Sequence, residues 1–276
     1  MNRKTLTAAL LATAALGASA ALSPAIAASE GFSSQEGFNA SGAPEWRFEL
    51  DPYLWLPTTS VNVGLGLLPD KNVSVPVGNV LSHFTGGFMG EGLARYGNWS
   101  AEMNLFWVSV GKNHDFTIPD TEGDQVNVRL HSGVFAISPG FGYRIDHTDK
   151  LALDARVGFT YLTANASAHI QDSPMAGVSR TSDFAQPWIG ERLSYFPSPK
   201  WRLVNTLALS GLGVDGGRMG WNGTIAASYL VNSWFDLSLG YRAVQTYKTQ
   251  SDGPMGQNLS VNILDYGPVL SGGFRF

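Results

Sequence analysis

The sequence contains no cysteine. The absence of cysteine excludes disulfide bonds, thiolate metal sites and a cysteine nucleophile. It also excludes a lipid anchor attached to a cysteine side chain. No other group of residues forms a complete metal-binding or cofactor-binding pattern, and we therefore expect neither a metal ion nor a cofactor.

Charge is scarce as well. Lys, Arg, Asp and Glu make up 14% of the 276 residues, against about 25% in a typical soluble protein. The formal net charge is −4, and a mildly acidic chain is a poor match for nucleic acid, which attracts basic surfaces. The composition therefore argues against nucleic acid as a partner and against an ordinary soluble enzyme.

The body of the chain has no run of about 20 apolar residues, so it contains no predicted membrane-spanning helix. One long apolar segment, Leu6–Leu22, follows a short basic start, and Ala25–Ala27 fits the rule for signal-peptide cleavage. We predict a signal peptide over residues 1–27, cleaved between Ala27 and Ala28, and export of the mature chain. The alternative is a membrane anchor, against which the Ala and Ser content and the cleavage box argue.

Glycine and aromatic residues are abundant, with 32 Gly, 15 Phe, 9 Tyr and 8 Trp. Many glycines and aromatics with few charges are typical of a transmembrane β-barrel, in which aromatic girdles meet the lipid headgroups. Most tryptophans fall near the ends of predicted strands, and girdle anchoring explains them without a ligand. These are Trp55, Trp99, Trp107, Trp188, Trp201, Trp221 and Trp234.

A two-residue period begins at Trp46, after a polar segment, 28–45, that we expect to be a disordered periplasmic tail. In the last strand the apolar side chains occupy one face and polar ones the other, as in a strand between lipid and a lumen. The apolar face of that strand holds Leu264, Tyr266, Pro268, Leu270, Gly272, Phe274 and Phe276. By the same alternation we expect Phe159 and Leu239 to face lipid near the middle of the membrane.

The alternation predicts an all-β fold, in which residues 46–276 form an antiparallel up-and-down transmembrane β-barrel of about ten strands. Eight or twelve strands remain alternatives. Two strands fit less well, because their lipid face would carry Glu191 and Asn205, unless a bulge or a register error intervenes. The predicted strands are 46–60, 84–96, 99–111, 129–144, 150–164, 184–196, 200–213, 219–231, 234–248 and 258–276. Short turns alternate with longer polar loops, which are 61–83, 112–128, 165–183 and 249–257.

Charges on the opposite face of these strands favour a narrow lumen. A soluble sandwich would also alternate, but its exposed face would carry Lys freely. Here Lys is nearly absent from the strands, and Arg occurs together with Asp and Glu, as expected where buried charges must pair. The predicted lumen charges are Arg47, Glu49, Asp51, Glu91, Arg95, Glu102, Asp154, Arg156, Arg202, Asp236, Arg242, Asp265 and Arg275.

Two interpretations of this lumen set remain open. The charges can form rings that select ions along a polar conduit. They can also form a plug of mutually paired Arg and carboxylates. Since a barrel of eight strands is just filled by its side chains and ten strands is close to that size, the strand number favours the plug.

Three segments carry a family resemblance: WRFELDPYLWLP, NVLSHFTGGFMGEGLARYGNWSAEMNLFWVSVG and DYGPVLSGGFRF. They resemble a widespread family of uncharacterised proteobacterial outer-membrane β-barrel proteins, over most of residues 46–276. The resemblance implies a barrel in the outer membrane, surrounded by lipid and lipopolysaccharide, and implies no catalytic residues. Phe276 resembles the aromatic C-terminal signal through which such proteins are delivered to the outer-membrane assembly machinery.

An enzyme at the outer rim is a rival hypothesis, since some outer-membrane barrels are proteases or lipid A hydrolases. His114 and Asp115 lie together near the predicted top of one strand, and His169 lies near Asp172 in a predicted outer loop. No serine accompanies them at a recognisable spacing, so the sequence favours a barrel without catalysis.

Two further motifs are weak. The acidic loop that contains Asp115, Asp120, Glu122 and Asp124 offers oxygen ligands for Ca²⁺, but it matches no complete calcium loop, and a solvated loop is favoured. Residues 211–216 spell G-x-G-x-x-G without a following helix, which favours a glycine-rich hairpin over a dinucleotide site. We predict a non-enzymatic outer-membrane barrel, either structural or with a narrow pore. The alternatives are a rim hydrolase and a surface binding or adhesion module, and the sequence indicates no oligomeric state.

Overall fold

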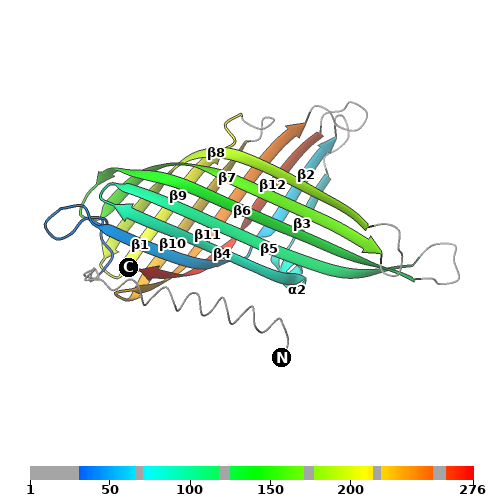
Figure 1. The fold of residues 1–276 in the computed structure, drawn as a ribbon, viewed down its shortest axis with the longest axis horizontal. Coiled ribbons are helices and arrows are strands. Elements are labelled where there is room, and N and C mark those ends of the chain that lie inside the picture. Colours follow the sequence, from blue (N-terminus) through cyan, green and yellow to red (C-terminus); the bar gives the residue numbers. More distant parts are fainter. Residues whose placement is uncertain (1–30, 66–70, 118–124, 171–176, 214–218, 251–258) are drawn as a thin grey trace.

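The computed structural model describes residues 31–65, 71–117, 125–170, 177–213, 219–250 and 259–276. These residues form one antiparallel sheet that closes on itself where β1 pairs with β12 (Figure 1). The strands are β1 (Trp46–Trp55), β2 (Thr58–Leu65), β3 (Lys71–Val75), β4 (Phe84–Tyr96), β5 (Trp99–Thr117), β6 (Gln125–His147), β7 (Leu151–Ile170), β8 (Gly177–Ser198), β9 (Trp201–Ser210), β10 (Met219–Asn232), β11 (Phe235–Gln250) and β12 (Leu259–Arg275). One short helix, α2 (Val77–Ser82), precedes β4.

The wall of the barrel has ten strands, as the alternation predicts. β1 and β2 both pair with β12 and act as one broken strand, and β3 pairs only with β2 among the described residues. The break falls at Pro57, which has no backbone N–H to donate to a ladder. The β2–β3 hairpin and α2 therefore belong to the first long connection, which we had expected to be a polar loop.

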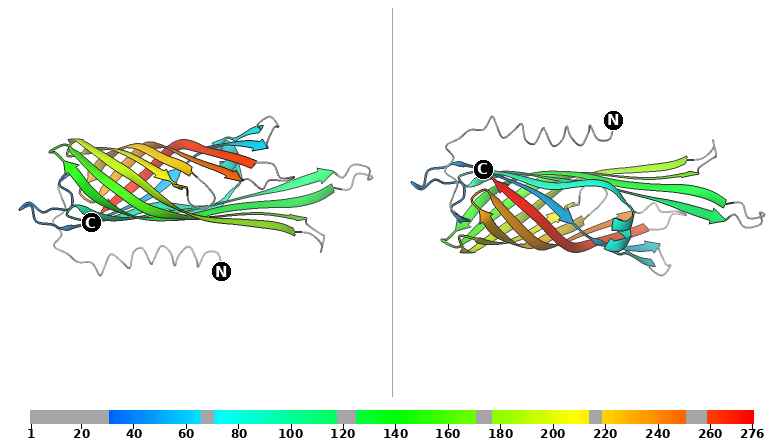
Figure 2. Two further views of the ribbon diagram at one scale, coloured as in Figure 1. Left: turned by 90° about the horizontal axis from the view of Figure 1, so that it is seen from above. Right: turned by 90° about the horizontal axis from the view of Figure 1, so that it is seen from below.

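Two other predicted loops are largely strand. β5 extends to Thr117 and β6 begins at Gln125. In the same way, β7 extends to Ile170 and β8 begins at Gly177. Together the four strands project beyond the rest of the barrel (Figure 2). The prediction of loops was wrong for the described parts of these segments, because polar composition indicates that a segment leaves the lipid and does not indicate that backbone pairing stops.

Four short connections join the strands at one end of the barrel, between β4 and β5, β6 and β7, β8 and β9, and β10 and β11. We call this end, which also holds Phe276, the turn end, and the opposite end the loop end. The segment 211–218 joins β9 to the antiparallel β10, and Gly211, Leu212 and Gly213 have positive φ. The antiparallel pairing of β9 with β10 confirms the predicted glycine-rich hairpin. No helix in the described part of the chain is long and apolar enough to cross a membrane.

The outward and inward faces follow the predicted alternation. Phe159 and Leu239 are 44% and 64% exposed in the isolated chain, and both point away from the lumen. Glu191 lies in the same outward row as Ile189 and Leu193. The ladder between β8 and β9 is regular there and pairs Leu193 with Asn205. Neither a bulge nor a register error is present, and the outer face does carry Glu191 and Asn205.

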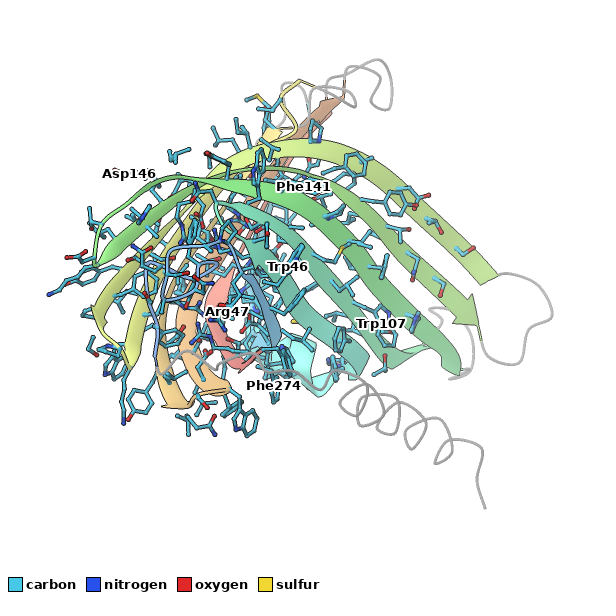
Figure 3. All side chains as sticks on the ribbon, turned by 60° about the vertical axis from the view of Figure 1, so that its left-hand side comes forward. Trp46, Arg47, Trp107, Phe141, Asp146 and Phe274 are labelled. Carbon is cyan, nitrogen blue, oxygen red and sulfur yellow. The ribbon has the colours of Figure 1, made fainter. Side chains whose placement is uncertain are left out.

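An aromatic ring surrounds the turn end. Trp46 lies 5.1 Å from Tyr96, Trp99 lies 4.8 Å from Tyr143, and Trp201 lies 5.0 Å from Tyr229, between ring centroids. Trp234 stacks near Phe274, and the side chains of Trp46, Trp107, Phe141 and Phe274 can be followed on the outer surface (Figure 3).

The girdle explanation is wrong for three tryptophans, Trp55, Trp188 and Trp221, which line the lumen. Nearness to a strand end does not specify a face, and neighbouring residues decide it. Trp188 occupies the space above Gly140 and Gly158, where a side chain would collide with its ring. Trp221 donates a hydrogen bond of 2.6 Å from its indole nitrogen to Gln245.

The facing of β11 gives a first test. Leu239→Arg should lower the free energy of unfolding by about 2–4 kcal/mol, because the substitution places a charge in the lipid. Ser238→Arg is the matched control on the same strand, since Ser238 lines the lumen cavity, and it should cost less. Urea unfolding in lipid vesicles measures both values. A larger loss for Ser238→Arg would contradict the assignment of the two faces.

Candidate functional site

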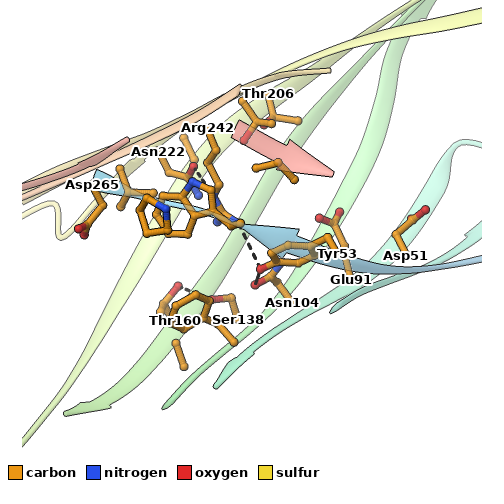
Figure 4. Close-up of a pocket in the computed structure, with 18 of the residues that line it drawn as sticks. Asp51, Tyr53, Glu91, Asn104, Ser138, Thr160, Thr206, Asn222, Arg242 and Asp265 are labelled. Atoms are coloured by element: carbon orange, nitrogen blue, oxygen red, sulfur yellow. Dashed lines mark hydrogen bonds between the residues drawn. The ribbon is translucent and has the colours of Figure 1, made fainter. Parts of the chain in front are cut away.

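The lumen encloses a cavity of about 1210 Å³. Its lining runs from Glu49 and Arg202 near the turn end to His131 and Ser210 near the loop end. Most of its charged side chains lie near the turn end, and mostly neutral and aromatic side chains line the rest, part of which Figure 4 shows. We call these two layers the charged floor and the outer cavity.

The first part of the charged floor is a triad centred on Asp154. Arg95 donates to both carboxylate oxygens of Asp154, at 2.5 and 3.3 Å, and the Nε of Arg144 donates to one of them at 3.0 Å. The three residues are only 2–4% exposed. The guanidinium groups of Arg95 on β4 and Arg144 on β6 therefore hold the carboxylate of Asp154 on β7.

The second part of the floor joins opposite walls. Arg156 holds Glu102 through contacts of 2.5 and 3.0 Å, and its guanidinium lies 5.4 Å from the ring of Trp188. Arg192 on β8 contacts Glu91 on β4 at 2.5 Å and Glu102 on β5 at 3.5 Å. Because β4 and β8 are separated by three strands on one side and five on the other, these ion pairs cross the lumen.

The third part of the floor includes the N-terminal segment. Arg202 on β9 contacts Glu49 on β1 at 2.9 Å, and Arg275 forms an ion pair with Glu36. Phe32 is 4% exposed and lies under both arginines, each 4.6 Å from its ring.

Several contacts fix the N-terminal segment to the barrel. Phe32 packs with Ala152, Phe196 and Leu230, and its amide donates to the carbonyl of Pro199 at 2.7 Å. Arg144 donates to the carbonyl of Ser34 at 2.6 Å. The expectation of a disordered tail is therefore wrong for the described residues 31–45, because local polarity cannot report contacts with distant strands.

The predicted lumen charges fall into two groups. Those with a carboxylate or arginine partner are Glu49, Glu91, Arg95, Glu102, Asp154, Arg156, Arg202 and Arg275, together with Arg47, which bonds Glu45 and does not line the cavity. Within the described chain, Asp51, Asp236, Arg242 and Asp265 form no ion pair, contrary to the expectation of general pairing. Sequence reasoning missed Arg144, Arg192 and Glu36. The alternation places Arg144 and Arg192 on the inward face and could have found them.

Arg242 in the outer cavity is held by neutral groups. Its Nε donates to Asn222 at 3.3 Å, and one terminal nitrogen donates to the hydroxyl of Tyr53 at 3.3 Å. The Tyr53 hydroxyl in turn donates to Asn104 at 3.2 Å (Figure 4). Asp265 accepts a hydrogen bond of 2.5 Å from Thr59.

The rim candidates give little support to catalysis. The side chains of His114, Asp115 and His169 and the whole of Asp172 lie outside the described residues, as does most of the acidic loop. Ser109 does lie 3.3 Å from the Nε2 of His131, but its hydroxyl also accepts a hydrogen bond from Thr85 and is 8% exposed. No carboxylate contact to His131 completes a triad among the described residues, and no group of three potential metal ligands is present there.

Comparison with known proteins identifies the fold. No family model and no curated protein matches the chain, so membership of the uncharacterised proteobacterial family stays a prediction. The outer membrane protease OmpT from Escherichia coli is similar, with a TM-score of 0.54 and 11% identity over 86% of this chain and 100% of that one. Ail of Yersinia pestis, an attachment invasion locus protein, gives a TM-score of 0.36 and 12% identity over 84% and 98% of the two chains. The toluene transporter TodX of Pseudomonas putida gives 0.32 and 13% identity over 86% and 91%. At these identities the likeness shows the fold alone, and that fold is the closed antiparallel β-barrel of bacterial outer-membrane proteins.

Proposed function

We propose that this protein is a non-enzymatic outer-membrane barrel whose lumen is closed at the periplasmic end by the charged floor. The observation that carries the proposal is the set of ion pairs that cross the lumen, above all Arg192–Glu91 and Arg202–Glu49. A side chain bonded to the opposite wall stands in the path of an ion, whereas the charges of a wet conduit line the wall and face the water.

The chemistry of the pairs supports closure. The planar fork of arginine binds two carboxylate oxygens and keeps its charge when water is removed. Arg95 and Arg156 both bind their carboxylates through two nitrogens. Lys would serve a hydrated channel equally well, but the floor contains only arginine as its cation.

Phe32 adds a buried apolar side chain to the ion pairs of the floor. It occupies the space below Arg202 and Arg275 at the turn end, which we assign to the periplasm because short turns face that side in outer-membrane barrels. The same proposal includes export through the predicted signal peptide, an environment of lipid and lipopolysaccharide, and a role of Phe276 in assembly. N-terminal sequencing of protein from outer-membrane fractions would test the cleavage before Ala28.

Single-channel recording in planar bilayers tests closure directly. The purified, refolded protein should insert and give little or no steady conductance, because side chains of the floor are bonded across the lumen. Insertion is verified independently by the flotation of vesicles that carry the protein. A large and stable conductance of the wild-type protein would show that the charges line an open pore, and closure would be wrong.

A further inference from the structure

The outer cavity differs from the charged floor in the chemistry of its walls. Its lining includes the aromatic residues Tyr53, Trp55, Phe106, Phe184, Trp188 and Trp221. Typical ligand sites have volumes of about 300–1000 Å³ and predominantly apolar walls with a few polar groups. The lumen cavity, at about 1210 Å³, has room for a ligand above the floor.

Arg242 is an unusual arginine in this lumen. Each other arginine that lines the cavity contacts a carboxylate: Arg95, Arg144, Arg156, Arg192 and Arg202. Arg242 has only neutral partners in the part of the chain that is described, and its guanidinium lies 5.2 Å from the ring of Trp55. Neutral partners orient the guanidinium, and no carboxylate among the described residues is bonded to it.

Asp265 is the counterpart of Arg242 on the neighbouring strand. Arg242 pairs with Gly267 across the β11–β12 ladder, and Val244 pairs with Asp265. Arg242 and Asp265 are therefore diagonal neighbours, and the Cα atoms of such neighbours lie about 7–8 Å apart. Both line the cavity, but Asp265 is bonded to Thr59 and Arg242 to Asn222 and Tyr53. Arg242 and Asp265 thus line the same cavity without being bonded to each other (Figure 4).

Two buried polar atoms in the same lining also lack partners. The indole nitrogen of Trp55 is a donor and the side-chain oxygen of Gln186 an acceptor, and neither has a hydrogen bond. Buried polar atoms are nearly always satisfied by protein, water or ligand. The outer cavity therefore offers one cation, one anion, one donor and one acceptor between aromatic walls.

We propose that the outer cavity binds a small aromatic zwitterion, a molecule of the amino-acid type. Its carboxylate pairs with Arg242, its ammonium group pairs with Asp265, and its ring packs against the aromatic walls. A carboxylate and an ammonium bonded to the same carbon can reach two side chains in a diagonal position, and a ring gains from offset or edge contacts with Trp and Tyr. A simple anion would be held by Arg242 and repelled by Asp265.

The ligand series that tests this proposal is phenylalanine, 3-phenylpropanoate, 2-phenylethylamine and glycine. The second and third lack the ammonium and the carboxylate, and the last lacks the ring. Calorimetric titration of the folded protein in lipid nanodiscs, corrected with empty nanodiscs, gives each dissociation constant. Phenylalanine should bind at least about tenfold more tightly than each of the other three, the scale of one hydrogen bond to a charged group.

Two variants test which charged side chain binds which group of the ligand. Arg242→Gln should bind phenylalanine about tenfold more weakly and no better than 2-phenylethylamine, while Asp265→Asn should lose the preference over 3-phenylpropanoate. Arg47→Gln, at a residue outside the cavity, should bind as the wild type does.

Several results would overturn the zwitterion site. They are tightest binding of 3-phenylpropanoate or 2-phenylethylamine by the wild type, equal binding of all four ligands, and unchanged affinity in Arg242→Gln or Asp265→Asn. If a variant fails to fold, the wild-type series alone decides. Conductance of the same preparation is a separate measurement, so a failure of closure and a failure of this site are distinguishable.

Discussion

Replacing Asp154 by Ala should lower the free energy of unfolding by about 3–5 kcal/mol, because the loss of one partner leaves buried charge unpaired. Asp154 is the carboxylate that Arg95 and Arg144 share, and the two arginines are 3% and 4% exposed. Without it, both guanidinium groups must either remain desolvated or draw water into the floor. The second route opens a path, so we also expect conductance to rise.

Urea unfolding in lipid vesicles and planar-bilayer recording measure the two effects of Asp154→Ala. Asp146→Ala is the matched control, because Asp146 is an exposed residue near the end of β6, and it should change stability by no more than about 0.5 kcal/mol. The triple variant Asp154→Leu, Arg95→Met and Arg144→Met should regain most of the lost stability, since apolar side chains of similar volume often replace a buried ion triad. A loss below about 1 kcal/mol in Asp154→Ala would show that the triad is hydrated.

The second large effect concerns Phe32. Phe32→Ala should release the N-terminal segment, because truncation of a buried Phe costs about 3–5 kcal/mol and the two cation–π contacts are lost as well. Those contacts come from Arg202 and Arg275. Conductance should rise severalfold, while the unfolding of the strands changes much less, because none of the wall ladders involves residues 31–45.

Hydrogen exchange of the amides of residues 31–45, together with bilayer recording, measures this release. Gln35→Ala is the control, since Gln35 is an exposed residue of the same segment, and it should leave both exchange and conductance unchanged. If Phe32→Ala exchanges faster but conducts no better, the ion pairs alone close the lumen. If exchange also stays unchanged, Phe32 does not anchor the segment.

Much of the barrel wall could be predicted from sequence because alternation is a local property. The ten wall strands and the outward facing of Phe159 and Leu239 follow from neighbouring residues alone. The strand extensions over 125–128 and 165–170 were missed because these segments were assigned to loops from their polar residues, although apolar residues alternate with polar ones in both. Trp188 was misassigned because its position depends on Gly140 and Gly158, which lie on other strands.

The charged floor could be predicted only as a list of residues. Its partners are far apart in the sequence: Arg192 and Glu91 by 101 residues, Arg202 and Glu49 by 153, and Arg275 and Glu36 by 239. No local pattern specifies which pair forms. For the same reason the sequence did not reveal that Arg242 is left out of the pairing, although the structure makes it the central residue of the proposed ligand site.

The position of Phe32 has a consequence for the order of folding. Its arginine neighbours come from β9 and β12, and β12 reaches its place only when the backbones of Phe276 and Phe48 bond to each other and the barrel closes. The segment that is synthesised before the wall strands can therefore complete its contacts only after the last strand is in place, because Arg275 supplies one of them. Full closure of the lumen thus depends on the first and the last parts of the mature chain together.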